Sequence, residues 1–272
     1  MITSFVREVL SEDLGRGDLF ERVAKDCEVS AKFLAKGKGI FSGERYLKVL
    51  CEMRGIALEL CKKDADSFER GEILAKITGS YIEILKIERT ALNMLQHSSG
   101  IATHTHAYAQ KIKDYSLKLL DTRKTRPLLR EFEKYSVRNG GGQNHRFGLD
   151  DALMLKDTHL AHINNLKEFI TQAREKLPFT CRIEVECESM QECKRAFESG
   201  VDIVMCDNMP PSLIAEVVAL RNASYPHILL EASGNITLEN IIEYAKSGVD
   251  AISSGSLIHQ ATWVDMSLKM ER

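Results

Sequence analysis

The sequence has no long hydrophobic segment, and its apolar runs stop at four residues, as in ALML at 152–155. A helix that spans a membrane needs about 20 predominantly apolar residues in succession, so such a helix is excluded. The first residues, MITSFVREVLSEDLG, place Arg and Glu among the apolar positions, where a secretory signal needs an unbroken apolar stretch. This segment predicts an amphipathic helix, and we expect a cytoplasmic protein that has no membrane partner.

The sequence also lacks an excess of either charge and any paired cysteine motif. Its 37 Lys and Arg against 39 Asp and Glu give a net charge of −2, which argues against a nucleic-acid partner. The 7 cysteines include no CxxC pair, which argues against structural zinc, and their odd number argues against a disulfide framework. Reduced thiols of a cytosolic protein are the simplest interpretation, and any charged site must be local.

Short apolar runs alternate with helical patterns over the last hundred and fifty residues. Helical patterns such as SMQECKRAFESG and TLENIIEYAKSG end on Gly200 and Gly248, the residue type preferred just after a helix. The runs are apolar on both faces, as strands of a parallel sheet between helices should be. They are LKLLDTRK (118–125 region), DALMLKD (151–157), RIEVECE (182–188), DIVMCDN (202–208), HILLEASG (227–234) and AISSGS (251–256). The fold class is therefore α/β, and six such units suit a barrel or a doubly wound sheet. The barrel is favoured because no GxGxxG turn follows a strand.

The first hundred residues have a different pattern. Strands are expected in 31–43, 56–63 and 71–79, with a helix at 44–55 between the first two. A long helix should follow from about Tyr81 and break at HSSG, residues 97–100. We expect a small α+β sandwich domain over 1–100 and an α/β barrel domain over 101–272, with a C-terminal helix at about 257–272 that packs back on the first domain.

Positive residues gather where two of the predicted strands end. Arg123, Lys124 and Lys156 each follow an apolar run, where a charged side chain must face the ligand cleft or an improbable buried partner. His145 and Arg146 lie between these strands in the sequence. Such a set suits a ligand with several anionic groups, because Arg binds carboxylate or phosphate with two hydrogen bonds and Lys adds a point charge.

The helix predicted at 130–139 carries three further cations. Arg130, Lys134 and Arg138 are expected on its outer, solvated face.

Carboxylates and small-residue turns follow the later strands. Glu186 and Asp207 could hold Mg²⁺, bind ribose hydroxyls, or form a plain salt bridge to Lys156 or Arg123. Alternation places Glu184 on the same face as Glu186, so periodicity does not separate the two. The turns at 232–235 and 253–256 each precede a helix and have the character of a phosphate-binding loop.

Several motifs in this order resemble one enzyme family. They are EDLGRGD, ERTALNMLQHSSGIAT, LDTRKTRP, GGQNHRFGLDDALMLKDTH, IEVE, DIVMCDN, EASGNI and SSGSLIH. Together they resemble quinolinate phosphoribosyltransferase over essentially the whole chain. The resemblance implies that quinolinate and phosphoribosyl pyrophosphate give nicotinate mononucleotide, pyrophosphate and CO₂ in de novo NAD synthesis. It also implies an incomplete barrel of six or seven strands after an N-terminal sandwich, Mg²⁺, no organic cofactor, and a homodimer.

The resemblance also implies roles for individual residues. Lys124, Lys156, Glu186 and Asp207 would be catalytic, and Glu186 and Asp207 would serve the Mg²⁺ shell. Arg89 would reach the site of the partner subunit. The implied substrate-binding set is Arg89, Thr122, Arg123, Lys124, His145, Arg146, Lys156, Glu186, Asp207, Ser233, Gly234, Ser254 and Gly255. The family pattern reads GDLT or GDIT where this chain has GDLF, so Phe20 removes a hydroxyl.

Alternative functions remain open at the level of sequence. A ModD-like paralogue would use another acceptor, and a nicotinate phosphoribosyltransferase would not decarboxylate. An aldolase-type barrel would use Lys156 as a Schiff-base nucleophile, and a phosphate-ligand sensor would bind without turnover. His97, His104 and His106 have a spacing that a metal cluster could use, although helix packing is the simpler interpretation.

Overall fold

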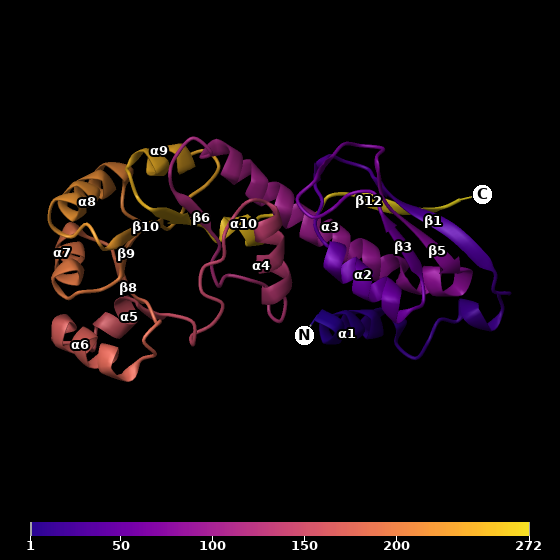
Figure 1. Cartoon of the computed structure of the whole chain (residues 1–272), viewed down its shortest axis with the longest axis horizontal. Helices are drawn as coiled ribbons and strands as arrows, with labels where there is room; N and C mark the ends of the chain where they lie inside the picture. The colour runs from indigo at the N-terminus through magenta and orange to yellow at the C-terminus, as the bar shows by residue number, and fades with distance from the viewer. Residues whose placement is uncertain (1, 272) are drawn as a thin grey trace. The chain divides into compact units, whose positions relative to one another are not determined.

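The computed structural model describes residues 2–271, which divide into two compact units (Figure 1). One contains residues up to 106 together with 135–141 and 261 onward, and the other contains 107–134 and 142–260. The single boundary expected near residue 100 differs from this division. Residue 100 lies inside one continuous helix, and two later segments of the chain join the first unit. Each unit is described by itself below.

The first unit is built on a four-stranded antiparallel sheet with the order β12-β1-β5-β3. Its core includes Val6 and Leu10 of the N-terminal helix, which is amphipathic as predicted. The strands and helix expected in residues 31–79 are also present. The elements are α1 (Ile2–Leu14), the 3-10 turn η1 (Phe20–Arg22), β1 (Glu28–Ala35), β2 (Gly39–Ile40), α2 (Glu44–Met53), β3 (Ala57–Leu60), β4 (Ser67–Phe68), β5 (Ile73–Ser80), α3 (Tyr81–Lys111) and β12 (Met266–Met270).

The helix predicted at about 257–272 is wrong. Only α10 (Ser256–His259) is helical there, and residues 266–270 form β12, which pairs antiparallel with β1. Met266 and Leu268 are buried while the residues between and after them are more exposed, which is the period-2 pattern of a strand. The segment does belong to the first unit.

The helix break predicted at HSSG is also wrong, because α3 runs through it without interruption. Ser98 donates its hydroxyl to Ser42 Oγ at 2.7 Å, and Ser99 donates to the Ser42 carbonyl at 3.2 Å. Gly100 lets another segment approach closely, since an added Cβ would lie 2.3 Å from the Thr262 carbonyl oxygen. These residues therefore serve tertiary contacts and do not end the helix. Within residues 2–271, no helix is both long and apolar enough to cross a bilayer.

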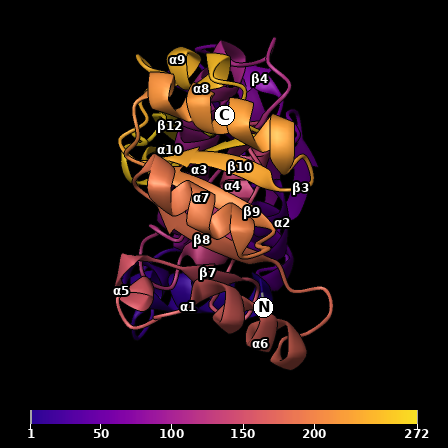
Figure 2. The same cartoon turned by 90° about the vertical axis from the view of Figure 1, so that its left-hand side faces the viewer.

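The second unit is the incomplete α/β barrel that the sequence predicted. Its six strands are all parallel, in the order β6-β11-β10-β9-β8-β7, and within the described residues no strand pairing joins β6 to β7. Helices α7 and α8 cover the outer side of the middle strands (Figure 2). The elements are β6 (Lys118–Leu120), α4 (Arg130–Asn139), β7 (Leu153–Leu155), α5 (Asp157–Leu160), α6 (Leu166–Lys176), β8 (Ile183–Cys187), α7 (Met190–Glu198), β9 (Ile203–Asp207), α8 (Pro211–Ser224), β10 (Leu229–Ser233), α9 (Ile241–Lys246), β11 (Ala251–Ser253) and α10.

Strand alternation divides the barrel residues into two sets. On β9 and β10, Val204 and Leu230 are fully buried on the side that faces the helices. Met205, Asp207, Glu231 and Ser233 have the opposite parity and point into the barrel, so the polar residues of these strands lie inside it.

Candidate active site

The carboxyl ends of the barrel strands surround a cavity of about 360 Å³. Ligands of parallel α/β folds bind at this end of the strands, because the loops there carry polar groups that the rigid sheet positions. The lining consists of Thr122, Arg123, Lys124, His145, Arg146, Met154, Lys156, Glu186, Met205, Asp207, Ser233 and Ser253. The structure thus brings together most of the predicted site residues, all except Arg89, Gly234, Ser254 and Gly255.

Arg123 and Arg146 form the cationic part of this pocket. Arg146 donates to the Ala152 carbonyl at 3.0 Å and approaches Met154 Sδ at 3.4 Å. Burial lowers the pKa of Arg146, and the nearby positive charge of Arg123 lowers it further. Arg123 Nε is buried and has no hydrogen-bond partner among the described residues. Two guanidinium groups that repel each other in a partly dry pocket form a site that an anion would stabilise.

Two turns after the last strands approach this cationic region. Gly234 has a φ of +88°, and an added Cβ would lie 2.7 Å from the Asn208 backbone nitrogen. Gly255 is close to Lys124, whose Cδ would lie 2.9 Å from an added Cβ. Both glycines therefore allow close approach, which is the requirement of a backbone loop that binds phosphate.

Lys156 and Glu186 form an ion pair at the ends of β7 and β8, with Nζ and Oε2 2.5 Å apart. The Lys156 side chain is 44% exposed, so the pair opens to the pocket. Asp207 ends β9 beside it and accepts a hydrogen bond from Asn208 Nδ2 at 2.7 Å. The plain salt bridge considered from the sequence is present, and both carboxylates still line the cavity. Their hard oxygen atoms suit Mg²⁺, which prefers such ligands.

Two predicted residues are not in the pocket lining for identifiable reasons. Ser254 donates its hydroxyl to the Ile236 carbonyl at 3.0 Å and its N–H to the Leu120 carbonyl at 3.0 Å. Both donors are thus used inside the fold, which does not support a substrate contact. Arg89 is exposed on α3 in the first unit, and its action in a partner subunit remains a prediction.

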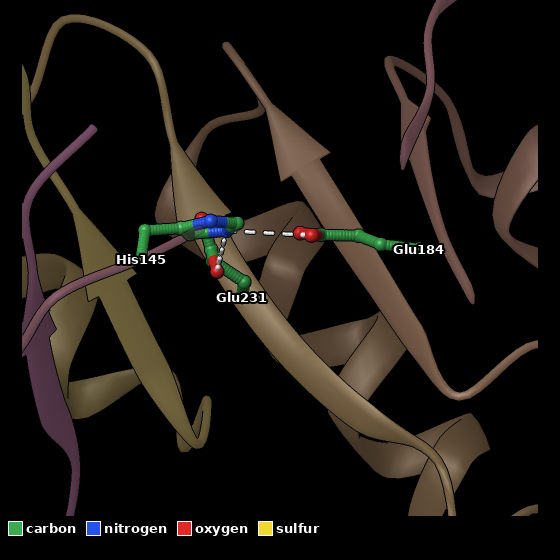
Figure 3. A group of neighbouring side chains, drawn as sticks. All are labelled: His145, Glu184 and Glu231. Atoms are coloured by element: carbon green, nitrogen blue, oxygen red, sulfur yellow. Dashed lines mark ion pairs between the residues drawn. The ribbon is translucent and has the colours of Figure 1, made fainter. Parts of the chain in front are cut away.

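Beneath the pocket lies a buried group formed by His145, Glu184 and Glu231 (Figure 3). Nε2 of His145 is 3.3 Å from a carboxylate oxygen of each glutamate. Glu184 is 1% exposed and Glu231 2% exposed, and they come from β8 and β10. Glu184 therefore lies one inward position deeper than Glu186, and of the two only Glu186 is among the residues that line the cavity.

The protonation of this group follows from its hydrogen bonds. Burial lowers the pKa of His145, but hydrogen bonds from Nε2 to Glu184 and Glu231 outweigh this effect and raise it, so the three groups together hold their protons more tightly. Burial also raises the pKa of Glu184. Nδ1 of His145 accepts the Arg146 N–H at 2.8 Å, so Nδ1 carries no proton. The retained protons therefore lie between Nε2 and the two carboxyl groups.

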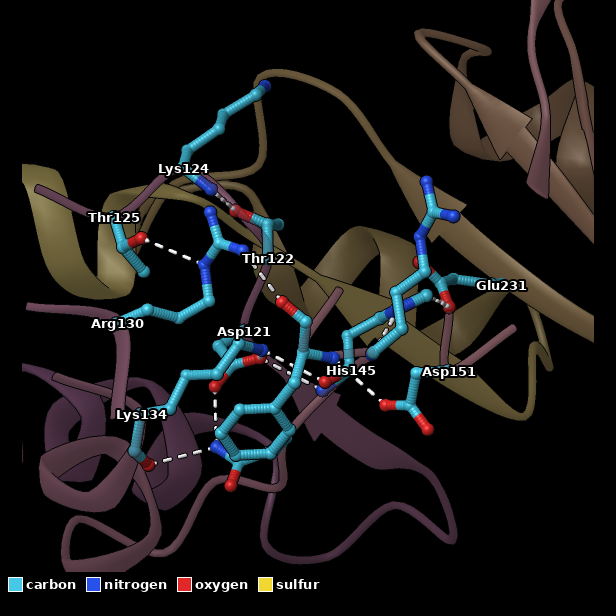
Figure 4. A network of polar contacts seen from close by, with 12 residues as sticks. Asp121, Thr122, Lys124, Thr125, Arg130, Lys134, His145, Asp151 and Glu231 are labelled. Carbon is cyan, nitrogen blue, oxygen red and sulfur yellow. Dashed lines mark hydrogen bonds and ion pairs between the residues drawn. The ribbon is translucent and has the colours of Figure 1, made fainter. Parts of the chain in front are cut away.

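A second buried network holds the main chain of the NHR segment (Figure 4). Lys134 and Asp121 form an ion pair, and both are fully buried. Asp121 accepts the His145 N–H at 2.9 Å and Asn144 Nδ2 at 2.6 Å, while Lys134 donates to the His145 carbonyl at 2.9 Å. Burial raises the pKa of Asp121 and lowers that of Lys134, and their mutual attraction opposes both shifts.

The expected solvated position of Lys134 is therefore wrong. Arg138 is exposed as expected, and Arg130 is half-buried with a hydrogen bond to the Phe147 carbonyl at 2.7 Å. Lys134 differs because Asp121, at the end of β6, supplies a buried partner that sequence spacing does not reveal.

Other pocket residues were missed although a signal for them existed. Met154, Met205 and Ser253 line the pocket from inward positions of β7, β9 and β11. Period-2 alternation from the predicted strand ends would have identified all three. The histidines on α3 do not join the described groups with metal-ligand spacing, and His97 packs edge-on against Trp263 with ring centroids 5.7 Å apart.

Comparisons with known proteins identify the family. The model of the quinolinate phosphoribosyl transferase C-terminal domain matches residues 101–269, and that of the N-terminal domain matches residues 18–99. The chain belongs to the quinolinate phosphoribosyl transferase family. The resemblance found in its motifs is thereby confirmed.

Relatives of this family match along almost the whole chain. A protein of Methanocaldococcus jannaschii named probable nicotinate-nucleotide pyrophosphorylase [carboxylating] is 41% identical, over 98% of this chain and 96% of the relative. A Dictyostelium discoideum protein named nicotinate-nucleotide pyrophosphorylase [carboxylating] is 34% identical, over 100% of this chain and 96% of the relative. The structure of the nicotinate-nucleotide pyrophosphorylase from Francisella tularensis has a TM-score of 0.92 at 34% identity, covering 99% of this chain and 96% of that chain.

Proposed function

We propose that this protein transfers the phosphoribosyl group of phosphoribosyl pyrophosphate to quinolinate and releases CO₂, giving nicotinate mononucleotide and pyrophosphate for NAD synthesis. Family membership and the names of full-length relatives support this reaction. The observation that carries it is the pair of guanidinium groups, Arg123 and Arg146, in one pocket with Lys124 and Lys156. This many cations suit an acceptor with two carboxylates and a donor with several phosphates.

The pocket suggests how the two substrates are divided. Arg123 and Arg146 would bind the carboxylates of quinolinate, because each guanidinium offers a planar pair of donors. Lys124 lies beside the Gly255 turn, so it would bind donor phosphates together with the Gly234 and Gly255 backbones. Glu186 and Asp207 would bind the ribose hydroxyls and the shell of Mg²⁺. The metal would supply positive charge that polarises the pyrophosphate leaving group.

The chemistry requires no nucleophilic side chain. The ring nitrogen of quinolinate attacks C1 of the ribose as the bond from C1 to pyrophosphate breaks, and Lys124 stabilises the charge that develops on the leaving group. The ring is then cationic, so the adjacent carboxylate can leave as CO₂ while the ring holds the electron pair. A proton from solvent takes its place. This sequence needs no organic cofactor.

We also propose a cytoplasmic homodimer in which Arg89 completes the site of the partner subunit. The exposed position of Arg89 on α3 is compatible with this role. Active mixed dimers, formed from an Arg89→Ala chain and a Lys156→Ala chain that are each inactive alone, would support it. Equal inactivity of the mixture would contradict it.

The test of the reaction is a direct assay of the purified protein. Quinolinate, phosphoribosyl pyrophosphate and Mg²⁺ are supplied, nicotinate mononucleotide and CO₂ are quantified, and nicotinate replaces quinolinate in the control. We expect equal amounts of nucleotide and CO₂ from quinolinate and no product from nicotinate. Donor binding without product would contradict the proposal and indicate another acceptor.

A further inference from the structure

Glu184 and Glu231 are two acids in the interior of the barrel that the reaction itself does not use. Both are almost completely buried, and each has one carboxylate oxygen, Oε1, without a hydrogen-bond partner among residues 2–271. Burying such groups costs free energy unless they are paired, and apolar residues of similar size often give a more stable core. Their position therefore requires an explanation other than stability.

Both carboxylates are directed at the same atom. Each has its other oxygen 3.3 Å from Nε2 of His145, and they approach the ring from β8 and β10 (Figure 3). Two strands of a rigid sheet thus fix the plane and the direction of one imidazole ring.

The ring passes this orientation on to Arg146. Nδ1 accepts the Arg146 N–H at 2.8 Å, so neither ring nitrogen of His145 is left to bind a substrate anion. Behind the ring, the buried pair of Asp121 and Lys134 holds the His145 N–H and carbonyl at 2.9 Å each. The backbone at 145–146 is therefore held from two sides, directly before the guanidinium that lines the pocket.

We propose that Glu184 and Glu231 are positioning residues that hold the His145 ring. Through the hydrogen bond between this ring and the Arg146 N–H, they orient the Arg146 guanidinium toward the carboxylates of quinolinate. His145 then acts as a spacer between the barrel interior and Arg146, not as the anion ligand that its place in the sequence predicted. The substrate named in this inference rests on the proposed function, while the geometry of the clamp does not.

The test compares Glu184→Leu, Glu231→Leu and their double variant with the matching Gln variants. Leu removes the acceptor, whereas Gln keeps an oxygen that can accept the Nε2 proton. We expect the double Leu variant to bind quinolinate about tenfold or more weakly, because small misplacement of a binding group is costly. Calorimetry should show that the affinity of the double Leu variant for phosphoribosyl pyrophosphate stays within about twofold of the wild type. Each Gln variant should recover much of the lost quinolinate affinity. Asp202→Asn is the control, since Asp202 accepts the Ile183 N–H at 2.7 Å at the opposite end of the strands.

The thermal stability of these variants distinguishes a positioning role of Glu184 and Glu231 from a merely structural one. The double Leu variant should keep a Tm near that of the wild type, because it removes both buried carboxylates and leaves the His145 ring, which lines the cavity, able to become neutral. A parallel loss of Tm and of affinity for both substrates would overturn the proposal, as would unchanged quinolinate affinity in the double Leu variant. One tightly bound divalent metal per chain that is lost in the Gln variants would also overturn it, because the group would then be a metal site.

Nitrogen NMR of His145 tests the clamp without any substrate. Free wild-type protein should show a protonated Nε2 and an unprotonated Nδ1, and the double Leu variant should lose this single tautomer. A wild-type ring with protonated Nδ1 overturns the clamp even if quinolinate turnover is confirmed. Retention of the tautomer in a protein that neither binds nor converts quinolinate supports the clamp and rejects the proposed acceptor.

Discussion

The mouth of the barrel pocket and the interior beneath it both contain basic side chains, but those in the interior are paired with protein groups and those at the mouth are less so. At the mouth, Arg123 and Arg146 lie near each other, and Arg123 Nε has no partner in the described part of the chain. In the interior, Lys134 is paired with Asp121, and His145 has both ring nitrogens engaged by protein groups.

The difference indicates a division of labour. A bound anion offsets the repulsion between neighbouring cations and so stabilises them, which makes the mouth suited to binding an anionic substrate. Polar groups that satisfy one another in a dry interior hold a single arrangement, so they keep the mouth preorganised. Substitutions in the interior should therefore affect stability or geometry, and substitutions of the charged side chains at the mouth should affect mainly substrate binding.

The largest effect is expected from breaking the interior ion pair. Lys134→Met leaves the Asp121 carboxylate buried without its partner, which should lower the free energy of unfolding by about 3–5 kcal/mol. Denaturant titration at neutral pH measures this loss. The double variant with Asp121→Leu should recover only part of it, because no buried charge remains but the His145 N–H and Asn144 lose their acceptor. Equal stability of Lys134→Met and the wild type would contradict the assignment of this pair as a buried structural contact.

At the mouth, Arg146→Ala should leave the fold intact and reduce kcat/KM for quinolinate by about 10²-fold or more. The matched control is Arg182→Ala, because Arg182 precedes β8 at the other end of the barrel and its side chain is 62% exposed. Steady-state kinetics and thermal melts on both variants provide the comparison. Near-wild-type kinetics for Arg146→Ala would remove this residue from the site.

The strand ends were predictable from the sequence because they depend on local pattern. Arg123, Lys156, Glu186 and Asp207 each lie at or near the end of a predicted strand, and the rule that parallel strands present ligands at their carboxyl ends brings them together. The partner of Lys134 was not predictable in this way. Its helix is mostly polar and yet largely buried, which becomes possible only when a distant segment supplies Asp121.

The C-terminal strand was missed for the same physical reason. Residues 266–270 become β12 because β1, from the other end of the chain, offers them a sheet edge. Local spacing reports the period of a segment, but it does not report the partner that decides between a short strand and a helix.

The two turns at the mouth allow a smaller test that compares glycines. Gly234→Ala places a Cβ at a positive φ and against Asn208, so it should lower stability by about 1–3 kcal/mol and weaken donor binding. Gly200→Ala has the same kind of φ, at +75°, with nothing within 4 Å of the added Cβ. It should cost only about 1 kcal/mol and leave activity unchanged. Donor affinity measured on both variants separates backbone strain from the loss of the turn, and equal donor affinity would argue against a phosphate role for Gly234.

The smallest effect should distinguish two serines that border the pocket. Ser254 uses its hydroxyl inside the fold, so Ser254→Ala should lower stability by about 1 kcal/mol and leave the KM for phosphoribosyl pyrophosphate unchanged. Ser233 accepts a hydrogen bond from Ser253 at 3.1 Å and lines the cavity, so Ser233→Ala should raise that KM several-fold with little effect on stability. A raised KM in Ser254→Ala would instead mean that the turn rearranges when the donor binds. Ser254 would then contact the donor and belong to the mouth of the pocket, not to the interior.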